Sequence, residues 1–194
     1  MYNAVKRILD LFLLILSSPF ILPVILILSL LIRLDSPGPV FFRQKRIGRR
    51  KRHFEIYKFR TMRIDTPRDV PTHLLEDPDS YITRLGRFLR KTSLDELPQI
   101  INILKGDMSF VGPRPALWNQ FDLITLRDGY GANDIRPGLT GLAQISGRDE
   151  LPIEEKAAID GKYMDQFGFW MDVKVFFLTF VSVFRQKGVK EGKS

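Results

Sequence analysis

Residues 11–32 read LFLLILSSPFILPVILILSLLI, an uninterrupted run without a charged side chain. As a helix rising about 1.5 Å per residue, the run is long enough to cross a bilayer core of about 30 Å. It is too long for the apolar part of a secretory signal, and no small-residue cleavage motif follows it. A helix buried in a soluble core would show water a polar face, which this run lacks. The sequence therefore predicts a membrane helix.

The topology of this helix depends on its middle and its flanks. Ser18-Pro19 and Pro23 lie near the middle, and proline removes a helical hydrogen bond and clashes with the preceding turn, so a bend is expected. Positive charge stands on both sides, at Lys6 and at Arg33, and positive flanks favour the cytoplasm. A re-entrant helix–break–helix satisfies both flanks. A proline-kinked ordinary span is equally compatible with the residues alone.

Composition excludes several classes of protein. The chain has 194 residues, a net charge of +8 and no cysteine, so disulfide scaffolds, iron–sulfur sites and cysteine nucleophiles are ruled out. Two histidines without a metalloprotease spacing argue against catalytic zinc. The positive charge is concentrated between Arg33 and Arg63, beside the apolar run. Such a juxtamembrane patch favours anionic lipid headgroups, with the cluster from Arg43 to Arg52 as the expected contact.

The rest of the chain predicts a mostly helical α+β domain with one small β-hairpin. Two β-rich runs, 40–42 and 54–59, flank a basic, glycine-containing turn, and prolines indicate a surface loop over 63–79. Apolar spacing predicts helices over 82–91, 95–106, 116–127, 151–166 and 171–186. The apolar segment Val175–Phe184 is too short to span a bilayer. We expect an amphipathic interfacial helix there, with a core helix as the alternative.

An adjacent acidic pair, Asp95 and Glu96, is the first candidate for chemistry. The conservative interpretation is helix capping, because Ser93 and Glu96 fit a capping box and Asp95 is itself a suitable N-cap residue. The functional interpretation starts from the free N–H groups of a helix N-terminus, which suit phosphate. One carboxylate could then meet a phosphorus atom while its neighbour holds a cation. The residues alone leave both interpretations open.

Basic residues form the second candidate set. Arg114 lies between two prolines and Arg136 precedes Pro137-Gly138, so each backbone is rigid and loses little entropy when the guanidinium grips a diphosphate. A solvated basic face is the alternative. The other members of the set are Lys58, Arg60, Arg84, Arg90 and Arg148.

Taken together, these segments resemble the bacterial sugar transferase family, the monotopic phosphoglycosyl transferases. The resemblance runs in family order from the N-terminus to about residue 187. Its motifs are SP (18–19), YKFRTM (57–62), SLDELPQ (93–99), LKGDMSFVGPRP (104–115), RPGLTG (136–141) and AQISGR (143–148).

The resemblance implies an enzyme that transfers a sugar 1-phosphate from a UDP-sugar to a polyprenyl (undecaprenyl) phosphate and releases UMP. This is the first membrane step of bacterial glycoconjugate synthesis. By the same resemblance Asp95 is the nucleophile of a ping-pong reaction with a covalent phosphosugar intermediate, and Glu96 helps to hold Mg²⁺. Lys58, Arg114 and Asp160 match further functional positions of the family.

The resemblance also favours the re-entrant topology, with the break at Ser18-Pro19. It implies a membrane segment over residues 1–36 and a catalytic domain over residues 37–194 on the cytoplasmic face of the inner membrane. Two other functions compete with this one. A membrane-tethered nucleic-acid-binding module is disfavoured because the basic segment has few interleaved aromatic residues, so no nucleic-acid partner is expected. A non-catalytic lipid-binding scaffold requires Asp95 and Glu96 to be mere caps.

Overall fold

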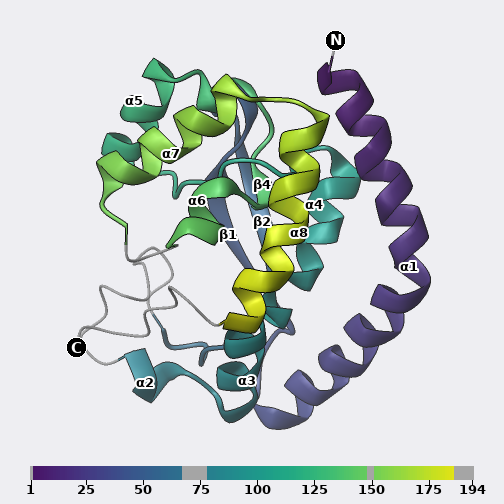
Figure 1. The fold of residues 1–194 in the computed structure, drawn as a ribbon. Helices are drawn as coiled ribbons and strands as arrows, with labels where there is room; N and C mark the ends of the chain where they lie inside the picture. The colour runs from purple at the N-terminus through teal and green to yellow at the C-terminus, as the bar shows by residue number, and fades with distance from the viewer. Residues whose placement is uncertain (1, 67–77, 148–150, 186–194) are drawn as a thin grey trace.

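The computed structural model describes residues 2–66, 78–147 and 151–185. As expected, this part of the chain is mostly helical and carries a small antiparallel hairpin (Figure 1). Its elements, with η marking 3₁₀ helices, are α1 (Tyr2–Asp35), β1 (Phe41–Ile47), η1 (Arg49–Lys51), β2 (His53–Phe59), α2 (Pro78–Tyr81), α3 (Arg84–Thr92), η3 (Leu94–Gln99), α4 (Ile100–Lys105), β3 (Ser109–Val111), α5 (Phe121–Gly129), η4 (Ala132–Asp134), β4 (Gly138–Thr140), α6 (Leu142–Ser146), α7 (Ile153–Asp165) and α8 (Phe169–Arg185).

Helix α1 curves along one side of the domain and touches it near both ends (Figure 1). Near its start, the Asp10 carboxylate accepts hydrogen bonds from the Ser109 hydroxyl at 2.9 Å and from the Phe110 N–H at 3.1 Å. Near its end, Leu28 and Ile32 are buried in a cluster of apolar side chains. The middle of the helix is largely exposed. Phe20, for example, has 77% of its surface accessible.

The expected interruption of this helix is not observed, because α1 is helical across Ser18, Pro19 and Pro23. A proline at position 19 cannot donate to the carbonyl of Ile15, four residues earlier. The Ser18 hydroxyl donates to that carbonyl at 2.8 Å instead. The carbonyl of Ile15 that Pro19 cannot bond therefore keeps a partner, as a helix in a membrane would require.

Strands β1 and β2 form the hairpin that the sequence predicts, with pairing from Phe41↔Phe59 to Ile47↔His53. Asn102 of α4, which is fully buried, closes the outer edge of β2. Its Oδ1 accepts from the N–H of Tyr57 at 3.0 Å, and its Nδ2 donates to the carbonyl of Glu55 at 2.7 Å. One side chain thus replaces a third strand.

A second, parallel pair of short strands, β3 and β4, was not predicted. Glycines in β4 and just after both strands permit an unusually close approach of two backbones. A Cβ on Gly138 would lie 2.1 Å from the backbone nitrogen of Gly112. A Cβ on Gly141 would lie 2.1 Å from the carbonyl oxygen of Gly112. Strands of only three residues carry little alternation that a sequence pattern can reveal.

Most predicted helices are present, with shifted ends. The helix expected over 95–106 is η3 followed by α4, and the one expected over 116–127 begins only at Phe121. Residues 116 and 117 instead pack into the core as a loop. Of the expected surface loop over 63–79, residues 67–77 lie outside the described part, and α2 occupies its end.

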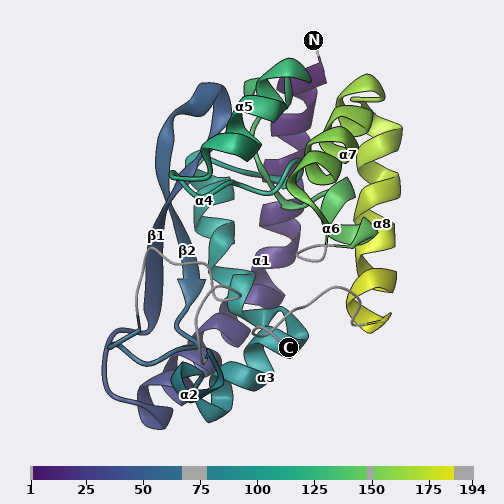
Figure 2. The same cartoon turned by 90° about the vertical axis from the view of Figure 1, so that its left-hand side faces the viewer.

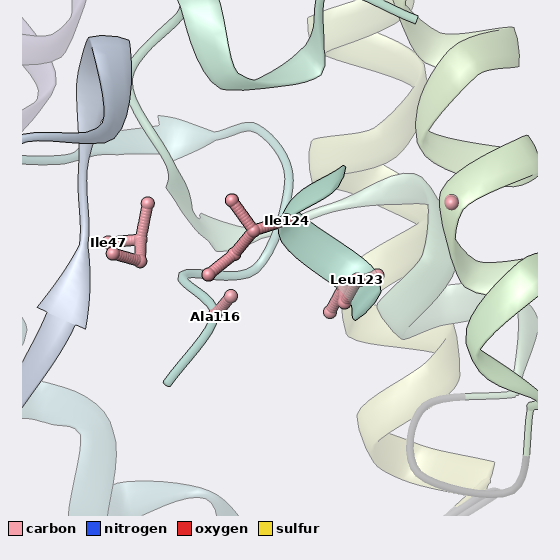
Figure 3. Close-up of a cluster of buried hydrophobic side chains, with 5 residues drawn as sticks. Ile47, Ala116, Leu123 and Ile124 are labelled. Atoms are coloured by element: carbon pink, nitrogen blue, oxygen red, sulfur yellow. The ribbon is translucent and has the colours of Figure 1, made fainter. Parts of the chain in front are cut away.

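One apolar cluster joins the hairpin to the helices around the site. It contains Ile47 at the end of β1, Ala116, Leu123 and Ile124 of α5, and Ala157 of α7 (Figure 3). Figure 2 shows the hairpin at one edge of the domain and α7 with α8 at the opposite edge. The cluster therefore links elements that flank the middle of the domain.

Helix α8 buries Met171 and Val175 against the domain. Its other side exposes large apolar side chains: Trp170 has 79% of its surface accessible, and Phe177 and Phe180 are also exposed. One side of α8 thus lies in the core and the other is apolar and exposed, and the interfacial placement stays a prediction.

Candidate active site

Asp95 and Glu96 lie in the first turn of η3, which packs against β2. Ser93 connects α3 to η3 with a backbone φ of +57°, a left-handed conformation that is uncommon for a residue other than glycine. Backbone strain of this kind is often found at functional sites. The reversal at Ser93 brings the acidic pair against the hairpin.

Glu96 is the centre of a charged cluster drawn from three segments. Its Oε1 accepts from Nζ of Lys58, on β2, at 2.7 Å. The same oxygen accepts from both terminal nitrogens of Arg114, at 3.2 and 3.1 Å. Sequence analysis placed these three residues in one site, and the structure brings them together.

Asp95 lies beside this cluster, with its Oδ2 3.9 Å from Nζ of Lys58. Its side chain is 14% exposed, so it has limited access to solvent. Burial raises the pKa of the Asp95 carboxyl, and the neighbouring Glu96 raises it further, while Lys58, Arg90 and Arg114 act in the opposite direction. Asp95 is therefore a poorly solvated carboxylate next to cations, which is a reactive combination.

Capping does not account for the acidic pair. Ser93, not Asp95, is the N-cap residue of η3, and its side chain makes no capping hydrogen bond. Oε1 of the Glu96 carboxylate binds Lys58 and Arg114. The capping-box interpretation and the Asp95 N-cap interpretation are both wrong.

Arg60 has a different place from the one expected. Its guanidinium is buried and donates to the carbonyls of Ser36 at 2.7 Å and Pro37 at 2.6 Å. It therefore binds the chain just after α1, where the last carbonyls of a helix attract cations. Arg60 thus holds the chain that follows α1, and within the described residues none of its hydrogen bonds reaches the cluster around Glu96.

Of the remaining basic candidates, one lies near Asp95 and the others that are described lie elsewhere. Arg90, in the last turn of α3, is near enough to lower the pKa of Asp95. Arg136 donates through Nε to the carbonyl of Gly106 at 2.8 Å, at the end of α4. Arg84 is exposed at the start of α3, and Arg148 lies outside the described residues.

Asp160 is fully buried and paired with Arg127, whose Nε donates to Oδ2 of Asp160 at 2.8 Å. Burial raises the pKa of the Asp160 carboxyl, and Arg127 opposes that shift. Asp160, which the resemblance placed among the substrate- and phosphate-binding residues, therefore lies in the interior and is bonded to Arg127. Sequence analysis missed Arg127. The available signal was a charged residue four positions after Leu123, on the apolar stripe of a predicted helix.

The acidic pair is also the candidate site for Mg²⁺. Proteins commonly hold Mg²⁺ through one or two carboxylates, with substrate phosphates supplying further oxygens. Within residues 2–66, 78–147 and 151–185 no group of three or more ligating side chains is found. Two adjacent carboxylates beside a phosphate-binding set therefore fit Mg²⁺ that arrives with a substrate rather than a preformed cage.

The fold and the site define an enzyme class: a domain carrying a long apolar helix, with a carboxylate pair facing the cations that phosphate groups require. The chain belongs to the bacterial sugar transferase family, whose family model matches residues 1–186. The family predicted from the sequence motifs is confirmed.

Several named proteins are similar over most of this chain. The protein named "Uncharacterized sugar transferase EpsL" of Bacillus subtilis is 41% identical over 168 residues, which cover 87% of this chain and 81% of that protein. The UDP-glucose:undecaprenyl-phosphate glucose-1-phosphate transferase of Caulobacter vibrioides is 42% identical, over 92% of this chain and 69% of its own length. The Escherichia coli protein of the same name is 40% identical over 94% of this chain, which spans only 40% of that relative.

Proposed function

We propose that this protein transfers a sugar 1-phosphate from a UDP-sugar to a polyprenyl phosphate, with Asp95 as the nucleophile and UMP as the first product. The observation that carries the proposal is the pair of carboxylates at Asp95 and Glu96 facing Lys58 and Arg114. The names of relatives support the reaction, since the Caulobacter protein is a UDP-glucose:undecaprenyl-phosphate glucose-1-phosphate transferase.

The first step forms a bond between a carboxylate oxygen of Asp95 and the phosphorus that bears the sugar. The bond from that phosphorus to the bridging oxygen breaks, and UMP leaves with the electron pair. In the second step an oxygen of the polyprenyl phosphate attacks the same phosphorus and displaces Asp95. Both substrates are polyanions, so a covalent intermediate lets UMP depart before the second anion enters.

Lys58 and Arg114 supply the positive charge that this reaction requires. In the structure both bind Oε1 of Glu96, so they are already ordered before a substrate arrives. Arg114 presents two terminal nitrogens, which match two phosphate oxygens. Charge that grows on the leaving UMP is stabilised by donors that need no reorganisation.

Glu96 holds these cations in place and, with Asp95, supplies the carboxylate oxygens that would bind Mg²⁺. Mg²⁺, when bound, neutralises the diphosphate and stabilises the departing phosphate charge. Glu96 is directly bonded to both Lys58 and Arg114, so it also sets where their positive charge lies relative to Asp95.

We further propose that α1 is re-entrant, with both ends on the cytoplasmic face of the inner membrane. The support is that Asp10 and Ile32, at opposite ends of the apolar run, both contact the same domain. The exposed aromatic face of α8 is suited to the headgroup zone. The basic residues of the hairpin are suited to anionic headgroups. This placement brings the site to the surface where a polyprenyl phosphate presents its charged end.

Intact-protein mass spectrometry with UDP-sugar alone tests the central proposal. The expected result is a mass increase equal to one sugar phosphate, located on Asp95, with one equivalent of UMP released. Asp95→Asn should give neither. The competing mechanism is direct displacement in a ternary complex. An unmodified protein that releases UMP only after polyprenyl phosphate is added would establish that mechanism and remove Asp95 as the nucleophile.

A further inference from the structure

The backbone around Arg114 is held by donors from three other segments. Each of the three consecutive carbonyls of Pro113, Arg114 and Pro115 accepts one hydrogen bond. The donors are the N–H of Gly138 at 2.9 Å, Nη1 of Arg127 at 2.8 Å and Nη1 of Arg46 at 3.0 Å, respectively. Two prolines remove the N–H groups through which this loop could have bonded itself. Its conformation is therefore fixed from outside.

Arg127 is the most constrained of these donors. Its Nε and Nη2 lie 2.8 and 2.5 Å from Oδ2 of Asp160, and its Nη1 binds the Arg114 carbonyl. The side chains of Arg127 and Asp160 are 5% and 1% exposed. A guanidinium is planar, so fixing two of its nitrogens against a carboxylate also fixes the direction of the third.

The surroundings of this pair are rigid. Arg127 extends from α5 and Asp160 from α7, and these two helices pack against each other. Leu123 of α5 and Ala157 of α7 share the apolar cluster that also holds Ala116, two residues after Arg114 (Figure 3). Close packing of this kind leaves little room for the loop to shift.

A buried ion pair is a costly way to hold two helices together. Desolvation of both charges offsets most of their attraction, and apolar side chains of similar size often stabilise as well. The pair does supply direction, because it aims one N–H of Arg127 at one carbonyl. That carbonyl belongs to the residue whose side chain binds Glu96.

We propose that Arg127 and Asp160 are positioning residues for Arg114: the buried pair fixes the Arg114 backbone so that its guanidinium faces Glu96 and the phosphate to be transferred. Neither residue touches the substrate. The role of Arg114 in this inference rests on the proposed function. The clamp on its backbone rests only on the contacts described above.

Arg127→Lys is the main test variant, since it keeps the charge beside Asp160 but lacks the planar fork that reaches the Arg114 carbonyl. We expect kcat/KM for the UDP-sugar to fall about tenfold to a hundredfold, as for a small misplacement of a catalytic group. In an Arg114→Ala background the same change should cost less than about twofold, because it acts through Arg114. Equal losses in both backgrounds would overturn the inference.

Hydrogen–deuterium exchange provides a readout that does not depend on activity. Arg127→Lys and Asp160→Asn should speed exchange in the peptide covering residues 112–117. The matched control is Asp128→Asn, on the same helix as Arg127, which breaks the exposed ion pair of Asp128 with Lys51. This variant should change neither activity nor the exchange of residues 112–117. Unchanged exchange in both test variants would overturn the positioning role.

The kinetic and exchange experiments together distinguish a failure of this inference from a failure of the proposed function. If the wild-type protein releases no UMP from any UDP-sugar, the proposed reaction fails, and the exchange experiment alone decides whether the pair clamps the loop. Should Arg127→Lys unfold, Asp160→Asn keeps the guanidinium and tests the same clamp. With turnover, the inference requires both the faster exchange and the coupling to Arg114.

Discussion

Nζ of Lys58 lies 2.7 Å from Oε1 of Glu96, within a hydrogen bond that joins β2 to the first turn of η3. The same nitrogen lies 3.9 Å from Oδ2 of Asp95. One cation thus serves two adjacent carboxylates, and it favours the ionised form of the one that we propose as nucleophile. The site holds its cations on Glu96, leaving Asp95 the less tightly paired of the two.

The pH dependence of the reaction should report this arrangement. Burial and Glu96 raise the pKa of Asp95, and Lys58 lowers it. Because the attacking form is the carboxylate, kcat/KM falls as pH drops through that pKa. Glu96→Gln removes a raising charge, so its acidic limb should move to lower pH. Lys58→Met removes a lowering charge, so its limb should move to higher pH. Initial rates of UMP release across pH measure both shifts.

The same experiment separates the roles of Glu96. Glu96→Gln should also lower the rate and raise the Mg²⁺ concentration needed for half-maximal activity, since one of two candidate ligands loses its charge. A Glu96→Gln protein with full activity, an unmoved acidic limb and a lower melting temperature would show that Glu96 is structural.

Asp95→Asn should abolish turnover without destabilising the fold. A carboxyl whose folded pKa is raised contributes stability that is present at low pH and lost as pH rises through the folded pKa. Asparagine does not ionise. The melting temperature of Asp95→Asn should therefore meet or exceed that of the wild type, and the difference should grow as pH rises through the raised pKa of Asp95. Thermal unfolding at several pH values measures it, with the exposed Asp122→Asn as the control. A lower melting temperature for Asp95→Asn at neutral pH would contradict this.

Asn102 should be a strong determinant of stability, because its side chain pairs two backbone groups at the edge of β2. Asn102→Ala leaves the Tyr57 N–H and the Glu55 carbonyl without their partner, at about 1–3 kcal/mol for each buried group. We expect the free energy of unfolding to fall by about 2–4 kcal/mol. Denaturant unfolding tests this. Ser146→Ala, an exposed change on α6, should stay within about 0.5 kcal/mol of wild type. An equally small effect of Asn102→Ala would contradict the edge-capping role.

The hairpin and most of the helices could be predicted from sequence, because each leaves a local trace. The grouping of Lys58, Glu96 and Arg114 came from the resemblance to the sugar transferase family. Strand alternation, apolar spacing and rigid proline-flanked arginines are properties of neighbouring residues. Arg60 and Arg127 could not be placed, because what they bind lies far away in the chain. Both are arginines, yet Arg60 binds the chain at the end of α1, whereas Arg127 binds the carbonyl of Arg114. Only the tertiary structure distinguishes these partners.

Helix α1 gives the same lesson in another form. Pro19 predicted an interruption of the helix, but α1 is continuous there and the Ser18 hydroxyl bonds the carbonyl of Ile15. The sequence shows that proline removes a backbone hydrogen bond, but only the structure shows that the Ser18 hydroxyl replaces it. The parallel pairing of β3 and β4 was missed because Gly112 and Gly138 are marked by close packing rather than by a pattern.

The re-entrant topology can be tested in this cysteine-free chain with single cysteines. Ala4 and Asp35 are exposed near opposite ends of α1, and Phe20 lies at its exposed middle. In intact cells an impermeant maleimide should label neither Ala4→Cys nor Asp35→Cys, and after permeabilisation it should label both. Phe20→Cys should stay protected in each case until detergent is added. Labelling of Ala4→Cys from outside intact cells would establish an ordinary span.

Steady-state kinetics should show the order of events that a covalent intermediate imposes. If UMP leaves before the polyprenyl phosphate reacts, double-reciprocal plots at several acceptor concentrations are parallel. Arg114→Ala should keep that pattern but lower kcat/KM for the UDP-sugar by about 100-fold to 1000-fold, because charge on the leaving phosphate grows toward the transition state. Arg114→Lys should recover part of the loss, since it restores a charge without the two-pronged contact. Intersecting lines for the wild type would mean that both substrates bind before any bond breaks. Parallel lines with an unchanged kcat/KM in Arg114→Ala would leave the covalent step intact but remove Arg114 from it.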